Sequence, residues 1–159
     1  MVDVMVDLDP SIVEALSILH RELAASCIPW VLTGSASFAL QGVPVIPEDV
    51  DLQTSSRGAY RIEERFADVV VDPVVYSSSE TIRSHFGTLE VAGVPVEVMG
   101  GLQKRVDGGW ERPVDVTAHR EFVTVFGMDL PVLSLSYEAT AYETLGRTER
   151  AALLRSFVE

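Results

Sequence analysis

Hydrophobic residues near the start of the chain recur at the spacing of an α-helix and predict a helix from about Pro10 to Cys27. The apolar face of this helix consists of Ile12, Leu16, Leu19 and Leu23. Ser11 and Glu14 form an S-x-x-E capping pattern at its start. Pro29 ends the helix, and the apolar run over 30–33 that follows predicts a short buried strand.

The next stretch alternates between small residues and apolar ones and predicts short elements. Gly34 and Ser35 connect the first strand to a short helix over 36–41, and Gly42 is expected to cap the end of that helix. After a proline-bearing loop, residues 49–54 predict a second strand.

The middle of the chain predicts one helix followed by several strands. Residues 57–68 have the pattern of an amphipathic helix, and 69–76 predict a strand that Pro73 restricts to a sheet edge or a bulge. Ala92-Gly93 then predicts the turn of a hairpin. The two strands of this hairpin are expected at 85–91 and 94–99.

The last third predicts a long loop over 100–112, with Asp107-Gly108-Gly109 as its turn, followed by more strands. These strands are expected at 114–117, 122–126 and 130–135. A helix interrupted near Gly146 follows from about Tyr137. Helices and strands mix without strict alternation, so we expect an α+β fold, a mixed β-sheet with flanking helices, rather than a doubly wound sheet.

Length and composition favour a single domain over residues 1–159. The chain is 47% hydrophobic and 23% charged, which provides enough apolar surface to offset the entropy of ordering. No apolar run reaches the ~20 residues needed to cross a bilayer, and the acidic start lacks the basic region of a secretory signal. One cysteine, Cys27, excludes an internal disulfide framework, so we expect a cytoplasmic protein.

Acidic residues clearly outnumber basic ones. The chain has 24 Asp and Glu against 12 Lys and Arg, which gives a formal net charge of −12. Nucleic acids and anionic membranes bind proteins mainly through Lys and Arg, so neither is an expected partner. A cationic ligand, by contrast, would be attracted.

Candidate chemistry is concentrated in the first two thirds of the chain. Gly34 and Ser35 lie where a strand meets a helix, a place where the backbone can approach a phosphate closely. Asp49 and Asp51 are two residues apart on a strand, so their carboxylates project from one face and repel each other unless a divalent cation lies between them. Oxygen-only ligands favour Mg²⁺. Glu97, on a later strand, is a third acid.

Each feature alone also fits an ordinary turn or a solvated strand face, but their order along the chain resembles the nucleotidyltransferase superfamily that includes DNA polymerase β. The family pattern is a hydrophobic strand, Gly-Ser or Gly-Gly, an Asp-h-Asp-h motif and a third acid. This chain supplies Leu32-Thr33-Gly34-Ser35, Asp49-Val50-Asp51-Leu52 and Val96-Glu97-Val98. The helix over 36–42 is similar to that of small antibiotic nucleotidyltransferases and AbiEii-type proteins. Two departures stand out: Val45 and Pro47 replace an Arg-x-Thr of many relatives, and the third acid is Glu rather than Asp.

The resemblance implies a polymerase β-like fold and Mg²⁺-dependent transfer of a nucleoside monophosphate from an NTP, expected to be ATP, to a hydroxyl. It implies that Asp49, Asp51 and Glu97 are catalytic and hold Mg²⁺ or Mn²⁺, and that Glu97 also activates the hydroxyl. The nucleotide-binding residues would be Gly34, Ser35 and Lys104. The hydroxyl would belong to a small molecule, such as a cationic aminoglycoside, or to a protein.

Two other functions fit the same residues. A non-catalytic nucleotide-binding or toxin–antitoxin interaction module would keep the fold and the acids but lose activity with the missing Arg-x-Thr. A metal-dependent phosphohydrolase is the third reading, although the sequence offers no dedicated water-activating group for it. Because the chain is short, its acceptor site could require a second copy in a homodimer or a separate toxin–antitoxin-type partner.

Overall fold

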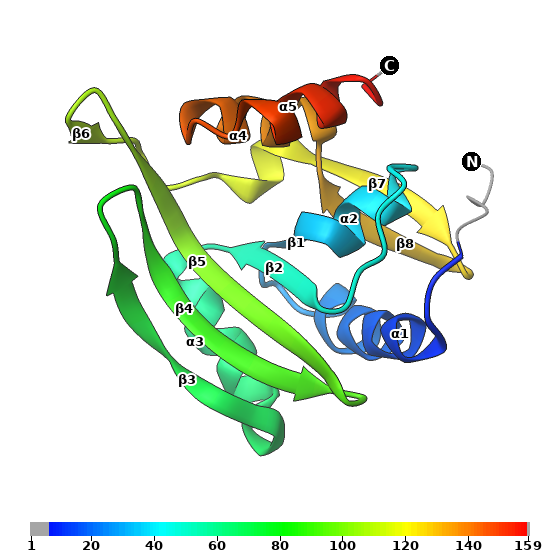
Figure 1. Ribbon diagram of the computed structural model, residues 1–159. Coiled ribbons are helices and arrows are strands. Elements are labelled where there is room, and N and C mark those ends of the chain that lie inside the picture. The colour runs from blue at the N-terminus through cyan, green and yellow to red at the C-terminus, as the bar shows by residue number, and fades with distance from the viewer. Residues whose placement is uncertain (1–6, 159) are drawn as a thin grey trace.

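A mixed β-sheet with helices on both faces forms the framework of the protein (Figure 1). The computed structural model describes residues 7–158, so the first six residues of the acidic start lie outside the described residues. The helices are α1 (Pro10–Ala24), α2 (Gly34–Leu40), α3 (Ser56–Arg65), α4 (Leu135–Thr144) and α5 (Thr148–Arg155), with 3-10 turns at Ala67–Val69 and Val116–His119. The strands are β1 (Trp30–Thr33), β2 (Val50–Thr54), β3 (Val70–Ser78), β4 (Ile82–Val91), β5 (Val94–Val106), β6 (Gly109–Trp110), β7 (Arg120–Val125) and β8 (Met128–Leu133).

The order of the strands across the sheet is β3-β4-β5-β2-β1-β8-β7, and the short β6 pairs with β5 outside this path. β1 runs antiparallel to β2, whereas β2 is parallel to β5 and β1 is parallel to β8. The sheet is therefore mixed, and the predicted α+β fold is confirmed. In the described part of the chain, none of the helices is both long enough and apolar enough to span a membrane.

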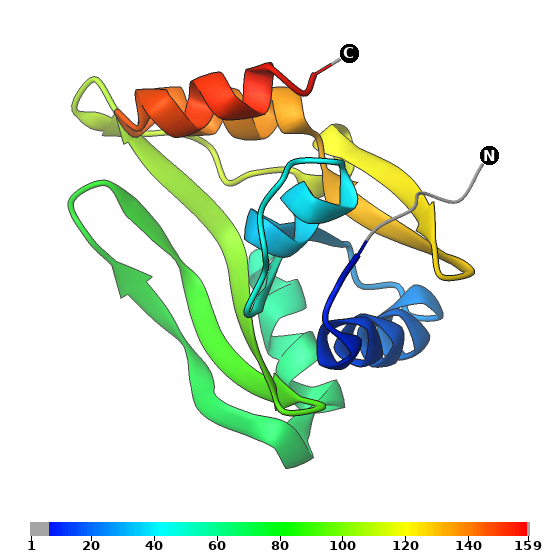
Figure 2. The ribbon, with the colours of Figure 1, turned by 45° about the vertical axis from the view of Figure 1, so that its right-hand side comes forward.

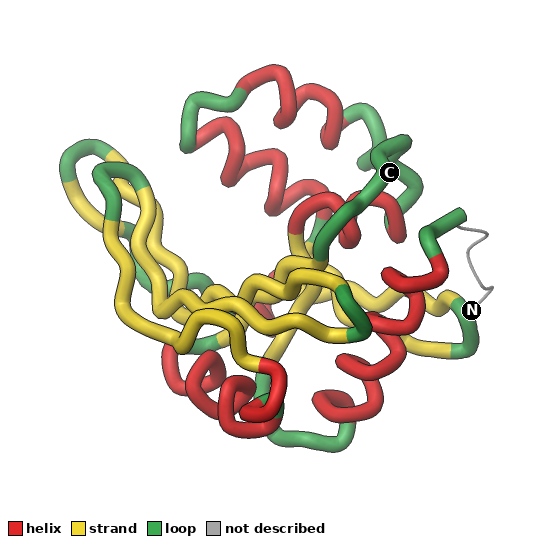
Figure 3. Tube along the Cα trace, turned by 60° about the horizontal axis from the view of Figure 1, so that its bottom comes forward, coloured by secondary structure: helices red, strands yellow, loops and turns green. Residues whose placement is uncertain are grey.

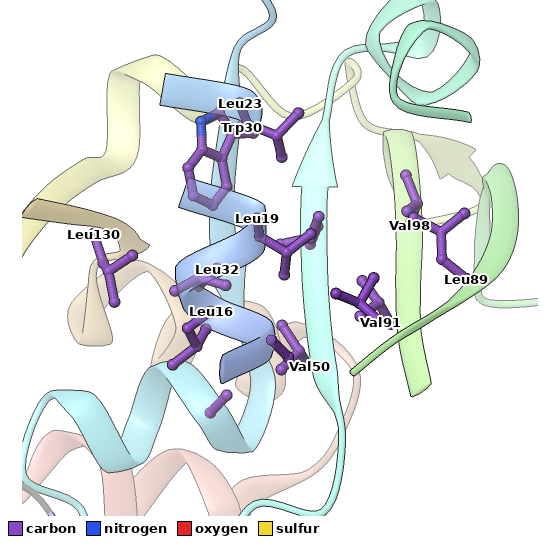
Figure 4. Packing of buried hydrophobic residues seen from close by; sticks show 14 of the residues in the cluster. Leu16, Leu19, Leu23, Trp30, Leu32, Val50, Leu89, Val91, Val98 and Leu130 are labelled. Carbon is purple, nitrogen blue, oxygen red and sulfur yellow. The ribbon is translucent and has the colours of Figure 1, made fainter. Parts of the chain in front are cut away.

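The main hydrophobic core lies between the sheet and the helices α1 and α3. Figure 4 shows Leu16, Leu19 and Leu23 of α1 beside apolar side chains of the strands, among them Leu32 and Val50. A second, smaller cluster joins α2, α4 and α5 on the other side. Figure 3 shows the sheet between these two groups of helices.

Helix α1 begins at Pro10 as predicted, but its N-cap and its end differ from the prediction. Its N-cap is Asp9, whose side chain accepts a hydrogen bond from the Ser11 amide at 2.9 Å, so Ser11 is not the cap. The helix ends at Ala24 rather than Cys27. The Ser26 hydroxyl donates to the Leu23 carbonyl at 2.6 Å and satisfies an oxygen that the end of the helix leaves free. Cys27 is exposed in the turn that follows.

The predicted loop over 100–112 is mostly strand. β5 continues to Val106 and forms a second turn at Asp107-Gly108, where φ is 50° and 80°. Two successive glycines, Gly100 and Gly101, are typical of a loop, but here they lie within a strand. Gly101 adopts φ +61° beside an irregularity in the β4–β5 pairing. The strand predicted at 114–117 is wrong: this stretch leads into a 3-10 turn whose N-cap, Asp115, accepts a hydrogen bond from the Thr117 amide at 3.1 Å.

The remaining predicted elements are confirmed, with shifts at their ends. β3 is an edge strand with irregular pairing between Asp72 and Val75, around Pro73, as the proline predicts. Ala92 and Gly93 both have positive φ in the β4–β5 turn.

Gly100 allows α3 to lie directly on β5. A Cβ atom at this position would lie 2.6 Å from the carbonyl oxygen of Ser55 and 2.7 Å from the Cβ of Ala59. Ser55 is the N-cap of α3, so its backbone cannot move aside without disturbing the start of that helix.

We therefore expect Gly100→Ala to lower the free energy of unfolding by about 1–3 kcal/mol, the usual cost of overpacking. Gly109→Ala is the matched control, because its Cβ would meet only the Val106 carbonyl oxygen, at 3.8 Å, and should change stability by less than about 0.5 kcal/mol. Urea unfolding of both variants measures the difference. Equal stabilities would show that the contact between α3 and β5 is not tight.

Candidate functional site

A cleft of about 400 Å³ lies between the open face of the sheet and helix α4. Figure 2 shows α4 and α5 at the top of the molecule, with α1 and α3 below. Four of the six predicted site residues line the cleft: Gly34, Asp51, Glu97 and Lys104. The structure therefore gathers residues from the β1–α2 junction, β2 and β5 at one place.

Asp51 and Glu97 are the centre of this arrangement. They are register partners on the parallel strands β2 and β5. Their strand neighbours Val50, Leu52 and Val96 are completely buried in the main core, so alternation directs the two acids to the opposite face. One carboxylate oxygen of Asp51, Oδ1, is buried and has no hydrogen-bond partner in the described part of the protein.

Burial above all, together with the negative charge of Asp49 and the contact with Glu97, raises the pKa of Asp51 to about 8. Water solvates this carboxylate poorly, and two other acids oppose its charge. Such a group gains most from a cation placed next to it. Asp49 itself precedes β2, is partly exposed and does not line the cleft, so it acts on Asp51 through its charge.

Gly34 brings the start of α2 against Asp51. Its φ is +70°, and a Cβ atom would lie 2.3 Å from Asp51 Oδ2. Only glycine tolerates both the backbone conformation and this approach. Ser35, the second residue of α2, is partly buried and does not line the cleft.

Lys104 is a buried cation in the wall of the cleft. Its side chain is 4% exposed, its Nζ lies 3.3 Å from a carboxylate oxygen of Glu111, and it donates to the Tyr137 hydroxyl at 3.4 Å. The Tyr137 ring in turn stacks on His119 at 4.0 Å between centroids. These contacts hold a positive charge at a fixed place in the wall that also contains Glu97.

Glu138 of α4 is a cleft residue that the sequence analysis missed. It is 4% exposed, and its Oε1 accepts a hydrogen bond from the Thr33 hydroxyl at 2.5 Å. The pKa of Glu138 is raised to about 8, mainly by burial. The negative charge of Asp51 also raises this pKa, whereas the hydrogen bonds from Thr33 and the Gly34 amide lower it. An acid in the first turn of a helix is normally exposed to solvent and interacts favourably with the helix dipole. The sequence therefore gave no indication that Glu138 is buried.

The predicted metal ligands Asp49, Asp51 and Glu97 stay a prediction. Within residues 7–158, no group of three or more His, Cys, Asp or Glu side chains is arranged to hold a metal ion. Asp51 and Glu97 nevertheless offer adjacent oxygen donors, one of them without a partner, and hard oxygen donors are what Mg²⁺ prefers. The donor set therefore fits the ion.

Comparisons with known proteins show the family and the fold. The family profile described as aminoglycoside-2''-adenylyltransferase matches residues 15–155. A crystal structure from Thermotoga maritima, provisionally classed as a nucleotidyltransferase, is 47% identical, with a TM-score of 0.85 over 95% of this chain and 94% of that chain. Among curated proteins, none matches the chain.

Two antibiotic-modifying proteins share the fold at low identity. The lincosamide antibiotic adenylyltransferase LnuA, solved with lincomycin bound, has a TM-score of 0.58 at 9% identity over 97% of this chain and 100% of that chain. The antibiotic-resistance factor ANT(2'')-Ia has a TM-score of 0.50 at 14% identity over 89% of this chain and 82% of that chain. These two likenesses concern the fold alone.

The raised pKa values of Asp51 and Glu138 make stability depend on pH. Each group holds its proton more tightly in the folded chain than in the unfolded chain, where carboxyls titrate near pH 4. The folded chain therefore binds more protons between about pH 4 and 8, and the free energy of unfolding should fall as the pH rises through this window. We expect a fall of at least about 1.4 kcal/mol, the equivalent of one pKa unit.

Urea unfolding in metal-free buffer at several pH values between about 5 and 8.5 measures this slope. Asp51→Asn and Glu138→Gln should each flatten it, whereas Glu64→Gln, on an exposed residue of α3, should leave it as in the wild type. Variants with the wild-type slope would show that neither acid is shifted.

Proposed function

The chain belongs to the aminoglycoside-2''-adenylyltransferase family and has the nucleotidyltransferase fold that its motifs predicted, and from this we propose that it transfers a nucleoside monophosphate from ATP to a hydroxyl of a small molecule. The observation that carries the proposal is the in-register pair Asp51–Glu97, which lies in a cleft beside the Gly34 turn. In our proposal this pair supplies the carboxylates for nucleotidyl transfer.

Asp51 and Glu97, with Asp49 beside them, would hold Mg²⁺. When bound, the ion would neutralise charge on the phosphates during displacement at the α-phosphorus. The negative charge that raises the pKa of Asp51 in the free protein is then matched by the ion. In our proposal the acids stabilise the complex with the ion and the nucleotide, and they lower the stability of the free protein.

Gly34, Ser35 and Lys104 would bind the triphosphate. The backbone of the Gly34 turn lies close to Asp51 at the start of α2, and in our proposal N–H groups of this turn donate to the phosphates. Lys104 contributes a buried positive charge from β5, where Glu111 and Tyr137 orient its ammonium group. Phosphate binding on this side compensates for the missing Arg-x-Thr ahead of Asp49.

Glu97 would act as the general base. Its carboxylate accepts the proton of the acceptor hydroxyl, and the hydroxyl oxygen forms a bond to the α-phosphorus while the bond to pyrophosphate breaks. The products are a nucleotidylated hydroxyl and pyrophosphate, with the proton on Glu97. The longer side chain of Glu, compared with Asp, extends the reach of this base by one methylene.

An antibiotic-like cation is the acceptor class that the observations favour. The family description names an aminoglycoside, and the net charge of −12 attracts cations. LnuA, which acts on a lincosamide, shows the same fold serving a second antibiotic class. A protein hydroxyl is the alternative acceptor, and a transfer assay that includes both classes separates them.

Glu97→Gln tests the proposed role of the base. The change keeps the size of the side chain and removes its charge, so transfer of ³²P from α-labelled ATP should drop by roughly 10²–10⁴-fold. The affinity for ATP·Mg²⁺ should change by less than about tenfold, because the other groups that bind the nucleotide remain. Calorimetry and the radiolabel assay measure the two quantities.

The matched control is Glu121→Gln, which makes the same change at an exposed position of β7 and should transfer like the wild type. Equal transfer by Glu97→Gln and wild type would remove Glu97 from the chemistry. A wild-type protein that binds ATP but transfers to no small molecule or protein would be a binding module, and one that releases phosphate would be a hydrolase.

A further inference from the structure

Thr33 is the N-cap residue of α2, but its side chain does not cap that helix. At the starts of α1, α3 and α4, the side chains of Asp9, Ser55 and Ser134 each accept a hydrogen bond from an amide of the first turn. The Thr33 hydroxyl instead donates to Glu138 Oε1 at 2.5 Å. A contact with a residue 105 positions away therefore takes the place of the usual local cap.

Glu138 also holds the residue that follows Thr33. Its carboxylate accepts a hydrogen bond from the backbone amide of Gly34, the first residue of α2. Because Glu138 is only 4% exposed, these two hydrogen bonds lie in a place of low dielectric, where they are stronger than at the surface. Glycine restricts its own backbone less than any other residue, so a turn built on it depends on such partners. One buried side chain of α4 therefore fixes the turn between β1 and α2.

The position of this turn decides how closely the backbone approaches Asp51. Thr33 is the register partner of Asp51 on the neighbouring strand. A Cβ atom on Gly34 would lie 2.3 Å from Asp51 Oδ2, so the backbone and the carboxylate are already in close contact. In the proposed function the phosphates lie at the turn and the ion at Asp51. A displacement of about 1 Å between two such groups can lower a rate on the order of 100-fold.

The neighbour of Glu138 on α4 reaches the other group that we assign to the triphosphate. The Tyr137 hydroxyl accepts a hydrogen bond from Lys104 Nζ at 3.4 Å, and its ring stacks on His119. Two successive residues of α4 thus contact the Gly34 turn and Lys104. The first turn of α4 therefore connects the two parts of the proposed phosphate site.

We infer that Glu138 is a positioning residue, which fixes the Gly34 turn for the triphosphate through its hydrogen bonds to the Thr33 hydroxyl and the Gly34 amide. The inference rests on the proposed function, because it adds a residue to the nucleotide side of the cleft. This role requires an acceptor oxygen and no negative charge. Gln supplies that oxygen at the same distance from the backbone, whereas Leu has a similar size and no acceptor.

Calorimetry with α,β-methylene-ATP and Mg²⁺ compares these two substitutions. Glu138→Leu should weaken binding by roughly tenfold or more, the equivalent of one or two hydrogen bonds, whereas Glu138→Gln should stay within about threefold of the wild type. Thr33→Val removes one of the two donors and should weaken binding by about threefold. The double variant with Leu and Val should bind no more weakly than Glu138→Leu alone, because both changes break the same bond.

An NMR signal of Gly34 reports the hydrogen bond without any nucleotide. The dipeptide Thr-Gly occurs once in the chain, at Thr33-Gly34. Labelling threonine carbonyls with ¹³C and glycine nitrogens with ¹⁵N therefore gives a single carbonyl-edited amide signal. Glu138→Gln should leave this signal near its wild-type position. Glu138→Leu should shift its proton upfield, because the amide loses its acceptor.

The matched control, Glu64→Leu, makes the same change at an exposed position of α3 and should behave like the wild type in both measurements. Equal losses of nucleotide affinity in Glu138→Gln and Glu138→Leu would overturn the inference, because the charge would then be what matters. Wild-type affinity in Glu138→Leu, or an unmoved Gly34 signal, would also overturn it.

Two further outcomes are informative. If Glu138→Leu does not fold, the other two variants decide: the inference requires that Thr33→Val weakens nucleotide binding and that Glu138→Gln does not. A wild type that binds no nucleotide, with a Gly34 signal that still responds to Glu138→Leu, would refute the proposed function and the inferred role in it. The hydrogen bonds of Glu138 to the turn would then be structural only.

Discussion

The parallel alignment of β2 with β5 sets Asp51 beside Glu97, and the chemistry that we propose depends on this alignment. Hydrophobic burial maintains it: Val50, Leu52, Val96 and Val98 face the main core, so a slip of one residue would bury the two acids and expose four apolar side chains. The same packing that stabilises the sheet therefore holds two like charges together.

The rest of the cleft offsets the repulsion between Asp51 and Glu97 only in part. Gly34 supplies close backbone contact without a side chain that would collide with Asp51. Lys104 places a positive charge in the wall, although Glu111 partly satisfies it. Glu138 adds a further acid, tied to Thr33 rather than to a cation. In the free protein the acids thus outnumber their compensating groups, and we propose that the ion and the nucleotide supply the missing positive charge and hydrogen-bond donors.

Much of this site could be predicted from strand periodicity and glycine positions, because both are local properties. Asp51 and Glu97 were recognised since each lies between apolar neighbours on a strand, and Gly34 since it lies at a strand–helix junction. Glu138 could not be recognised, because its burial arises from α4 packing across β1, a contact between residues 105 positions apart. The extension of β5 past Gly100 was missed for a similar reason: the close approach of α3, and not local preference, requires glycine there.

The central claim is that Asp51 and Glu97 share a divalent cation with the triphosphate of the nucleotide. Crystals grown with Mn²⁺ and α,β-methylene-ATP, with data collected at the manganese absorption edge, locate the ion directly. The account predicts an anomalous peak within coordination distance, ~2.2 Å, of a carboxylate oxygen of both residues and of a phosphate oxygen. A nucleotide bound in the cleft with its manganese away from both carboxylates would contradict it.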